Sequence, residues 1–234
     1  MASGDVQALQ ILPMEMETRA FMTRVYGWMS AGLALTGAIA YAVAGSEAMV
    51  RAIVLNQWIF WGLLLAELAL VWILSAAIQK MSVAVASGMF LVYASLNGLT
   101  LSVIFLAYTS ASIALTFFVT GGTFFAMCLY GATTKRDLTS MGNLMFMALI
   151  GLILASVANW FFQNPALYWI TTYAGVAIFV GLTAYDAQKV KRMSQVLEEG
   201  SEAASKAAVI GALALYLDFI NLFLFLLRIF GRRR

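Results

Sequence analysis

Seven long apolar segments constrain the fold of this chain more than any other feature of its sequence. A helix needs about 20 mostly apolar residues to cross the hydrocarbon layer of a membrane, and each crossing segment must satisfy its own backbone hydrogen bonds. The runs are continuous and lack the alternation of barrel strands. We therefore predict an all-α integral membrane protein with seven transmembrane helices. The predicted spans cover residues 25–45, 58–78, 83–108, 112–130, 141–162, 166–185 and 207–229.

Composition supports this class and limits the domain organisation. Of the 234 residues, 63% are hydrophobic and 11% are charged, and the mean hydropathy is +0.90. Soluble domains average about 45–50% apolar and about 25% charged residues. Seven spans leave too little chain for a separate soluble domain. We expect a tail over residues 1–24 and one seven-helix transmembrane domain over residues 25–234.

The placement of lysine and arginine predicts the orientation in the membrane. Connections rich in these residues stay in the cytoplasm. The odd-numbered connections contain only Arg51, so we expect the tail to be cytoplasmic, and the compact connections favour a bacterial inner (plasma) membrane. If all seven helices cross, the C-terminal arginine cluster 232–234 lies outside; a half-inserted last helix is the alternative. The basic residues on the tail side are Arg19, Arg24, Lys80, Lys135, Arg136, Lys189, Lys191, Arg192 and Lys206.

Missing residue types exclude several chemistries. The chain has no histidine, so nucleophile systems based on histidine, haem with a histidine ligand and histidine zinc sites are excluded. Proton sensing must then use carboxyl groups. The single cysteine, Cys128, lies in an apolar run and cannot form an intrachain disulfide. The net charge of +3 comes from residues between spans, so we expect no nucleic acid partner. We also expect no cofactor.

Three acidic residues fall inside or at the ends of the apolar runs. A charge at the membrane centre costs about 2.5–3.5 kcal/mol on insertion scales, so such residues are retained for a reason. Asp218 lies about 16 Å deep in its span, and it must face a water-filled cavity, pair with another group or be protonated. Asn221 shares its helix face, and with Glu67 it is a candidate for an ion pathway. Glu67 is either a member of that pathway or a protonated donor between helices.

The third acid, Asp186, closes span six, and its interpretation depends on whether it is considered alone or together with Asp218. Alone it is a carboxylate at a helix end among lipid headgroups. Consecutive spans are usually neighbours, however, and these two run antiparallel. Two carboxyl groups at hydrogen-bonding distance cannot both ionise cheaply, so Asp186 and Asp218 would titrate as a unit, and calcium could replace the shared proton. The predicted boundaries place Asp186 shallower than Asp218 by up to about 16 Å.

The last span, LYLDFINLFLFLLR at residues 215–228, and the Tyr185-Asp186 pair resemble the Bax inhibitor-1 (transmembrane Bax-inhibitor-motif) family. The resemblance implies a seven-helix fold with the last helix central. It also implies a pH-sensitive calcium leak gated by paired aspartates, to which Asp186 and Asp218 correspond. Some members carry an arginine at the end of span two that engages the span-six aspartate; here only Lys80 could replace it. Glu67 matches a span-two acid of relatives.

We therefore expect a calcium leak rather than an enzyme. A proton shared by the two aspartates would keep the cytoplasmic exit closed. Loss of that proton would separate the two side chains and let calcium pass. An intramembrane aspartyl protease is a remote alternative, because such enzymes carry Gly-x-Gly-Asp and a later proline motif. This chain has residues 215–218 as Leu-Tyr-Leu-Asp, and its last proline is Pro165.

The main alternative is a membrane-embedded interaction protein that modulates proteases or stress responses, in which the aspartates are structural. Its expected partners are other membrane proteins, whereas the leak requires only the lipid bilayer, calcium and protons. Copurification of a partner that survives asparagine at both Asp186 and Asp218 would distinguish it from the leak.

Overall fold

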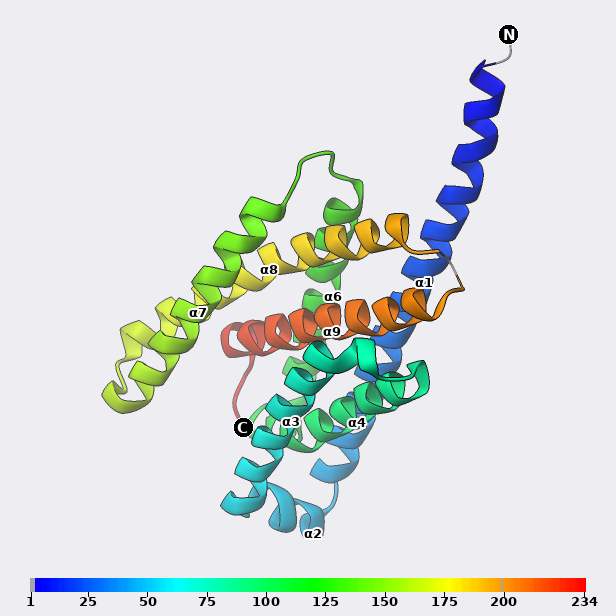
Figure 1. Ribbon diagram of the computed structural model, residues 1–234. Coiled ribbons are helices and arrows are strands. Elements are labelled where there is room, and N and C mark those ends of the chain that lie inside the picture. Colours follow the sequence, from blue (N-terminus) through cyan, green and yellow to red (C-terminus); the bar gives the residue numbers. More distant parts are fainter. Residues whose placement is uncertain (1–2, 199) are drawn as a thin grey trace. The chain divides into compact units, whose positions relative to one another are not determined.

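The computed structural model describes residues 3–198 and 200–234 (Figure 1), and the burial of side chains is described from residue 16 onwards. Residues 1 and 2 of the predicted tail and Glu199 of the sixth connection lie outside the described residues. The described chain is helical apart from its connections and one isolated antiparallel bridge. Its elements are α1 (Ser3–Ala44), α2 (Glu47–Met49), the π-helix η1 (Val50–Val54), α3 (Gln57–Ala77), the 3₁₀-helix η2 (Ile78–Lys80), α4 (Val83–Leu101), α5 (Val103–Ala107), α6 (Ser110–Thr133), α7 (Thr139–Phe162), α8 (Pro165–Val196) and α9 (Glu202–Phe230).

Seven stretches of described helix are long and apolar enough to cross a membrane, as the sequence predicts. Of these, α9 buries 67% of its most apolar window inside the protein, against 6–44% for the other six. This is the burial expected of a helix surrounded by others. The seven are Met16–Ala44, Gln57–Lys80, Val83–Ala107, Ser110–Thr133, Thr139–Phe162, Pro165–Val196 and Glu202–Phe230.

Polar residues between the apolar runs set the starts of several helices. Asn56, Ser82 and Thr109 each precede a helix in extended conformation, and each side chain accepts a hydrogen bond from the N–H group three residues on. Asn164 caps α8 through the N–H groups of residues 166 and 167. Such caps satisfy the first N–H groups, which have no partner within the helix. Each of these helices therefore begins at a polar capping residue that lies between two apolar runs.

Two predicted spans differ from the helices of the structure, one by an interruption and the other by its end. Span three is interrupted at Ser102, so that α4 and the short α5 replace one helix. Span six does not end at Tyr185, because α8 continues to Val196. The extension is amphipathic: Ala187, Val190 and Ser194 recur every three or four residues and are buried, a helical period that hydropathy alone hides. The prediction that Asp186 closes span six is therefore wrong.

Helix α1 also begins earlier than predicted span one. It is continuous from Ser3, so the predicted tail is helical over its described residues and joins the span without a break. The residues long and apolar enough to cross begin at Met16 rather than Val25.

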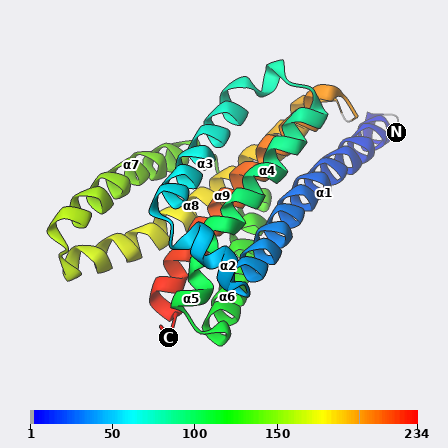
Figure 2. The same ribbon diagram turned by 90° about the horizontal axis from the view of Figure 1, so that it is seen from below.

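The contacts divide the chain into two compact units, residues 1–103 with 189–213 and residues 104–188 with 214–234. In the first unit, α4 packs against α1 and α3, and Figure 2 shows α1 and α4 running side by side. Thr36 donates a hydrogen bond to the carbonyl oxygen of Ala94 (2.8 Å). A Cβ on Gly98 would lie 2.8 Å from the carbonyl oxygen of Thr36, so glycine permits this close approach.

The second unit contains α5, α6, α7 and parts of α8 and α9. Its core joins Leu152 of α7, Phe179 of α8 and Leu222 of α9 with their neighbours. Helix α6 packs on α9 through Phe219, whose ring lies 5.5 Å from that of Phe117 and 5.4 Å from that of Phe124. Cys128 of α6 is buried, as expected for a small apolar residue.

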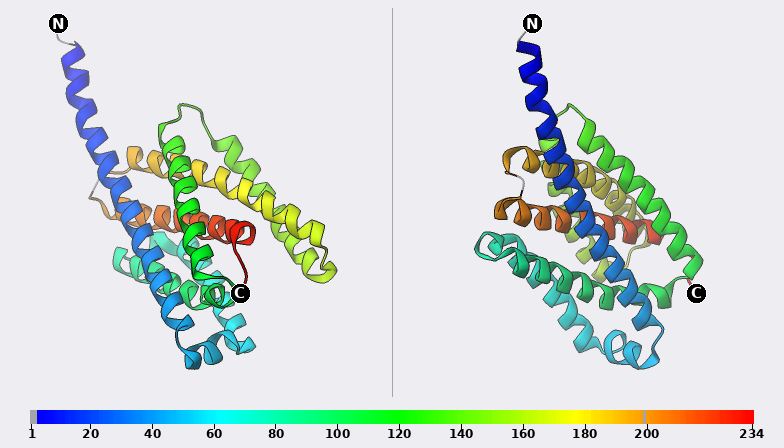
Figure 3. Two further views of the ribbon diagram at one scale, coloured as in Figure 1. Left: turned by 180° about the vertical axis from the view of Figure 1, so that it is seen from behind. Right: turned by 90° about the vertical axis from the view of Figure 1, so that its right-hand side faces the viewer.

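The C-terminal residues lie at the same end of the second unit as the α5–α6 connection (Figure 3). Thr109 donates its N–H to the carbonyl oxygen of Arg232 (3.0 Å), and Tyr108 forms the isolated bridge with Arg233. Helix α9 is also continuous and long enough to cross. These contacts place the arginine cluster at the end of the second unit opposite the α6–α7 connection, which contains Lys135 and Arg136.

Candidate functional site

The structure brings Asp186 of α8 and Asp218 of α9 together within the second unit. Their carboxyl groups lie within hydrogen-bonding reach of each other. Asp218 is 4% exposed, and its Oδ2 has no hydrogen-bond partner among the described residues. Ionised carboxylates only accept hydrogen bonds, so a direct bond between the two groups requires a proton on one of them. The pair can therefore hold one proton between two helices.

The extension of α8 reduces the depth difference between the two aspartates from the about 16 Å that the sequence suggested to about 9 Å. Asp186 lies ten residues before the end of α8 at Val196, and Asp218 lies sixteen residues after the start of α9 at Glu202. At 1.5 Å per residue these positions are about 15 Å and about 24 Å from the connected ends. Both carboxyl groups are thus well inside their helices.

Close contacts on both sides of Asp186 fix its position. A Cβ on Gly131 of α6 would collide with the backbone carbonyl of Ala184, and a Cβ on Gly142 of α7 would lie 2.5 Å from the Tyr185 ring. After Asp186, the Gln188 side chain donates to the carbonyl oxygen of Arg136 (2.8 Å) and accepts from the N–H of Leu138 (2.9 Å). Helix α8 is therefore held against α6 and α7 around the carboxyl group.

Sequence analysis did not find Gly131, Gly142 or Gln188 as positioning residues. Glycines are frequent in these spans, and nothing in the sequence marks the two that contact α8. For Gln188 the sequence offers one signal, its spacing: it lies four residues, or one helical turn, after the apolar Ala184. In the structure both residues are buried on the same face of α8.

Asn221 lies one turn beyond Asp218 and is half-buried. Its Nδ2 donates to the carbonyl oxygen of Leu217 (2.8 Å), four residues earlier in α9. On α6, Thr116 is fully buried and its Oγ1 has no hydrogen-bond partner among the described residues. The second unit thus has two buried polar atoms with unused hydrogen-bonding capacity, Thr116 Oγ1 and Asp218 Oδ2.

Glu67 belongs to a separate polar cluster in the first unit. It is 8% exposed and joins α3 to α4, because Oε1 accepts from the Thr100 hydroxyl (2.8 Å) and Oε2 accepts from Asn97 Nδ2 (3.3 Å). Asn97 Nδ2 also approaches the Tyr93 hydroxyl (3.5 Å), and its Oδ1 has no partner in the described part of the chain. If the Asn97 amide turned over, a protonated Glu67 could donate to Oδ1.

This cluster predicts how substitutions of Glu67 affect stability. Glu67→Ala removes the acceptor of two buried hydrogen bonds and should lower the free energy of unfolding by about 1–3 kcal/mol. Glu67→Gln should cost less than half as much, because a glutamine amide both donates and accepts beside Asn97. Thermal unfolding in detergent measures both, with the exposed Glu47→Ala as control. Equal losses in Glu67→Ala and Glu47→Ala would contradict a structural role for the cluster.

Lys80, the predicted substitute for a latch arginine, is exposed at the end of η2 in the first unit. Its neighbour Gln79 accepts a hydrogen bond from Lys206 Nζ through its backbone carbonyl (3.3 Å), which ties η2 to the start of α9.

No cluster of three or more cysteine, aspartate or glutamate side chains suited to a metal occurs among the described residues. Asp186 and Asp218 supply two carboxyl groups, and calcium takes six to eight oxygen ligands in proteins. Calcium bound at this pair would therefore need water or backbone oxygens as well.

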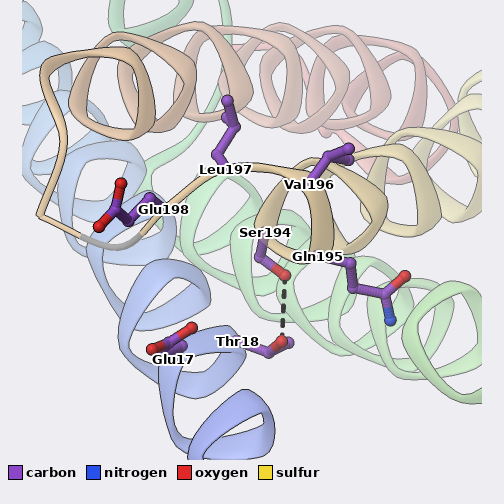
Figure 4. A pocket seen from close by; sticks show the side chains of 7 residues that line it. All are labelled: Glu17, Thr18, Ser194, Gln195, Val196, Leu197 and Glu198. Atoms are coloured by element: carbon purple, nitrogen blue, oxygen red, sulfur yellow. Dashed lines mark hydrogen bonds between the residues drawn. The ribbon is translucent and has the colours of Figure 1, made fainter.

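A hollow of about 230 Å³ lies in the first unit, where α1 passes the end of α8 (Figure 4). Ser194 donates to the Thr18 hydroxyl (3.3 Å) across one side, and the exposed Glu17 and Glu198 lie at its edge. The structure has helix to Val196 and a connection after it.

The fold and this site define a class: a multi-pass membrane protein with seven membrane-spanning helices and, on the last two, a pair of carboxyl groups of which one is buried and the other half-buried. Comparison with known families agrees, because the family model described as inhibitor of apoptosis-promoting Bax1 matches residues 18–234. The chain belongs to the Bax inhibitor-1 family, which confirms the resemblance drawn from the last span.

Several bacterial proteins are similar over almost their whole length. Inner membrane protein YbhL of Escherichia coli (strain K12) is 54% identical over 217 residues, which cover 92% of this chain and 93% of that protein. A protein of Borreliella burgdorferi is 44% identical over 92% of both chains. A protein of Deinococcus radiodurans is 43% identical over 93% of this chain and 92% of its own length.

Proposed function

We propose that this protein is a pH-sensitive calcium leak of a bacterial inner membrane, with its N-terminus in the cytoplasm and the pair Asp186–Asp218 as its gate. The observation that carries the proposal is the contact between two carboxyl groups on different helices, one of them buried with a free oxygen. The family membership supports it, and the name of the relative YbhL supports the location.

The proton held by the pair determines whether the gate is open. While one carboxyl group is protonated, it donates to the other and joins α8 to α9. Loss of that proton leaves two negative charges in contact inside a low-dielectric interior, where their repulsion is strong. Separation of the two helices relieves this repulsion and exposes carboxylate oxygens to a passing cation. Calcium suits these oxygens because it prefers hard oxygen ligands. Glu67 and Asn221 are further candidates for the ion pathway.

Calcium flux into liposomes tests this function directly. Purified protein is reconstituted with a calcium indicator inside, and the rate of entry is measured over a series of pH values beside protein-free liposomes. We expect flux that rises with pH. Flux equal to that of protein-free liposomes, or flux that does not depend on pH, would exclude the gated leak and favour the interaction protein.

A further inference from the structure

The arginines at the end of α9 are unusual for a membrane protein with this charge distribution. Arg228 and residues 232–234 lie at the end of the second unit opposite Lys135 and Arg136. The acids of this unit are Asp137, in the α6–α7 connection, and the gate pair within the helices. In the described part of the chain, no ion pair involves any of the four arginines. Their charges are therefore not neutralised by the protein.

The backbone of the C-terminal residues is nevertheless held in place. Besides the bond from Thr109 to Arg232, the N–H of Arg232 donates to Ser112 Oγ (2.9 Å), and the N–H of Arg234 donates to the carbonyl oxygen of Ala107 (3.1 Å). The Tyr108 ring packs on Gly231, where an added Cβ would lie 2.5 Å from a ring atom. The backbone of this segment is therefore ordered, while its guanidinium groups form no ion pair among the described residues and keep their positive charge, although Arg234 also donates to Ser110 Oγ (3.5 Å).

A hollow of about 390 Å³ opens beside this segment, and Arg233 lines it. The rest of its lining comes from the α7–α8 turn and includes Asn159, Trp160, Gln163 and Tyr168. The volume lies within the range of about 300–1,000 Å³ typical of small-molecule sites. Arg228 does not line the hollow but lies beside one of its lining residues, because its guanidinium carbon is 5.6 Å from the centre of the Tyr168 ring and 4.9 Å from that of the Phe225 ring. The hollow thus has one arginine and several amide groups in its lining, and a second arginine lies beside its Tyr168.

The surroundings of the hollow are those of a membrane interface. Trp160 is 66% exposed at the end of α7, and Trp169 stacks on Tyr173 with ring centres 5.7 Å apart. Tryptophan and tyrosine gather at the level of lipid headgroups. Below Trp160, the exposed apolar side chains of Leu154 and Val157 continue along α7. A molecule in the hollow would therefore have its polar part beside the arginines and apolar chains along α7.

We propose that this hollow binds the headgroup of an anionic phospholipid from the leaflet on the C-terminal side. Guanidinium groups bind phosphate oxygens in pairs of parallel hydrogen bonds, and their geometry suits this better than that of lysine. The site explains why arginines are retained on the side where positive charge is otherwise sparse. It uses none of the gate residues and does not depend on the calcium leak.

Binding of short-chain lipids to the purified full-length protein in detergent tests the proposal. Dioctanoyl-phosphatidylglycerol should bind, and dioctanoyl-phosphatidylcholine should bind at least about tenfold more weakly, as measured by native mass spectrometry. Arg233→Gln should weaken phosphatidylglycerol binding by about tenfold, the loss of one charged hydrogen-bonding group. Arg233→Lys should fall between the two, because lysine keeps the charge without the paired geometry.

The matched control is Arg136→Gln, which removes the same charge from an exposed residue at the opposite end of the unit. It should bind phosphatidylglycerol like the unaltered protein. Arg228→Gln gives a second comparison that leaves the C-terminal backbone untouched, and it should also weaken binding. Equal binding of the two lipids, equal effects of Arg233→Gln and Arg136→Gln, or glycerol phosphate binding as tightly as the lipid would each overturn the proposal.

Discussion

Asp218→Asn is expected to abolish the pH dependence of calcium flux. Asparagine has both a donor and an acceptor, so it can keep the hydrogen bond to Asp186 at every pH, and it has no proton to lose. One linked proton can change the open population by up to about tenfold per pH unit in the native protein. The variant should remain closed, with flux near that of protein-free liposomes from about pH 5 to about pH 8. Asp186→Asn should behave in the same way.

The control for this experiment is Asp137→Asn in the same unit. Asp137 is exposed in the α6–α7 connection, and its Oδ1 accepts from the N–H and hydroxyl of Thr139 (2.9 and 2.7 Å). An asparagine oxygen can accept the same bonds, so the pH response should be unchanged. If Asp218→Asn instead follows the native pH profile, the carboxyl pair is not the gate, and a structural role in an interaction protein becomes the better interpretation.

The seven spans could be predicted from the sequence because the membrane imposes a simple requirement. Each crossing segment must be apolar for about 20 residues, so its centre is visible in the hydropathy alone. An acid such as Asp218 is conspicuous against that background, since its burial is costly. The predicted end of a helix is wrong where the helix continues beyond its apolar segment, because the membrane no longer requires apolar residues there. Helix α8 continues past Tyr185 as an amphipathic helix, and its regular burial at Ala187, Val190 and Ser194 is a weaker signal than a change in hydropathy.

Partners across helices could not be predicted, because hydropathy does not specify which faces meet. Glu67 was identified as a costly acid, but Thr100 and Asn97 look like ordinary polar residues of the next helix until the contacts between α3 and α4 are known. The sequence also could not predict where in the fold the C-terminal arginines lie. Charge counting made them an anomaly, and only the backbone bonds to the α5–α6 connection place them at a definite end of the unit.

The contact between Gly131 and Ala184 predicts a large effect on stability. A methyl group at residue 131 would collide with a backbone carbonyl, which cannot rotate away as a side chain can. Gly131→Ala must therefore push α6 from α8, and overpacking of this kind costs about 1–3 kcal/mol. For a chain of this length, each kcal/mol corresponds to about 2–4 °C in Tm. Thermal unfolding in detergent should show a fall in Tm of several degrees.

The same substitution should disturb the gate, because Ala184 lies two residues before Asp186. A shift of α8 moves that carboxyl group relative to Asp218 and should weaken the pH dependence of calcium flux. Gly121→Ala in the same helix is the matched control, since an added Cβ there meets nothing within 4 Å. It should leave the flux unchanged and raise the free energy of unfolding by up to about 1 kcal/mol, the usual gain of alanine over glycine in a helix. Equal Tm values for the two variants would show that α6 and α8 are not in contact at Gly131.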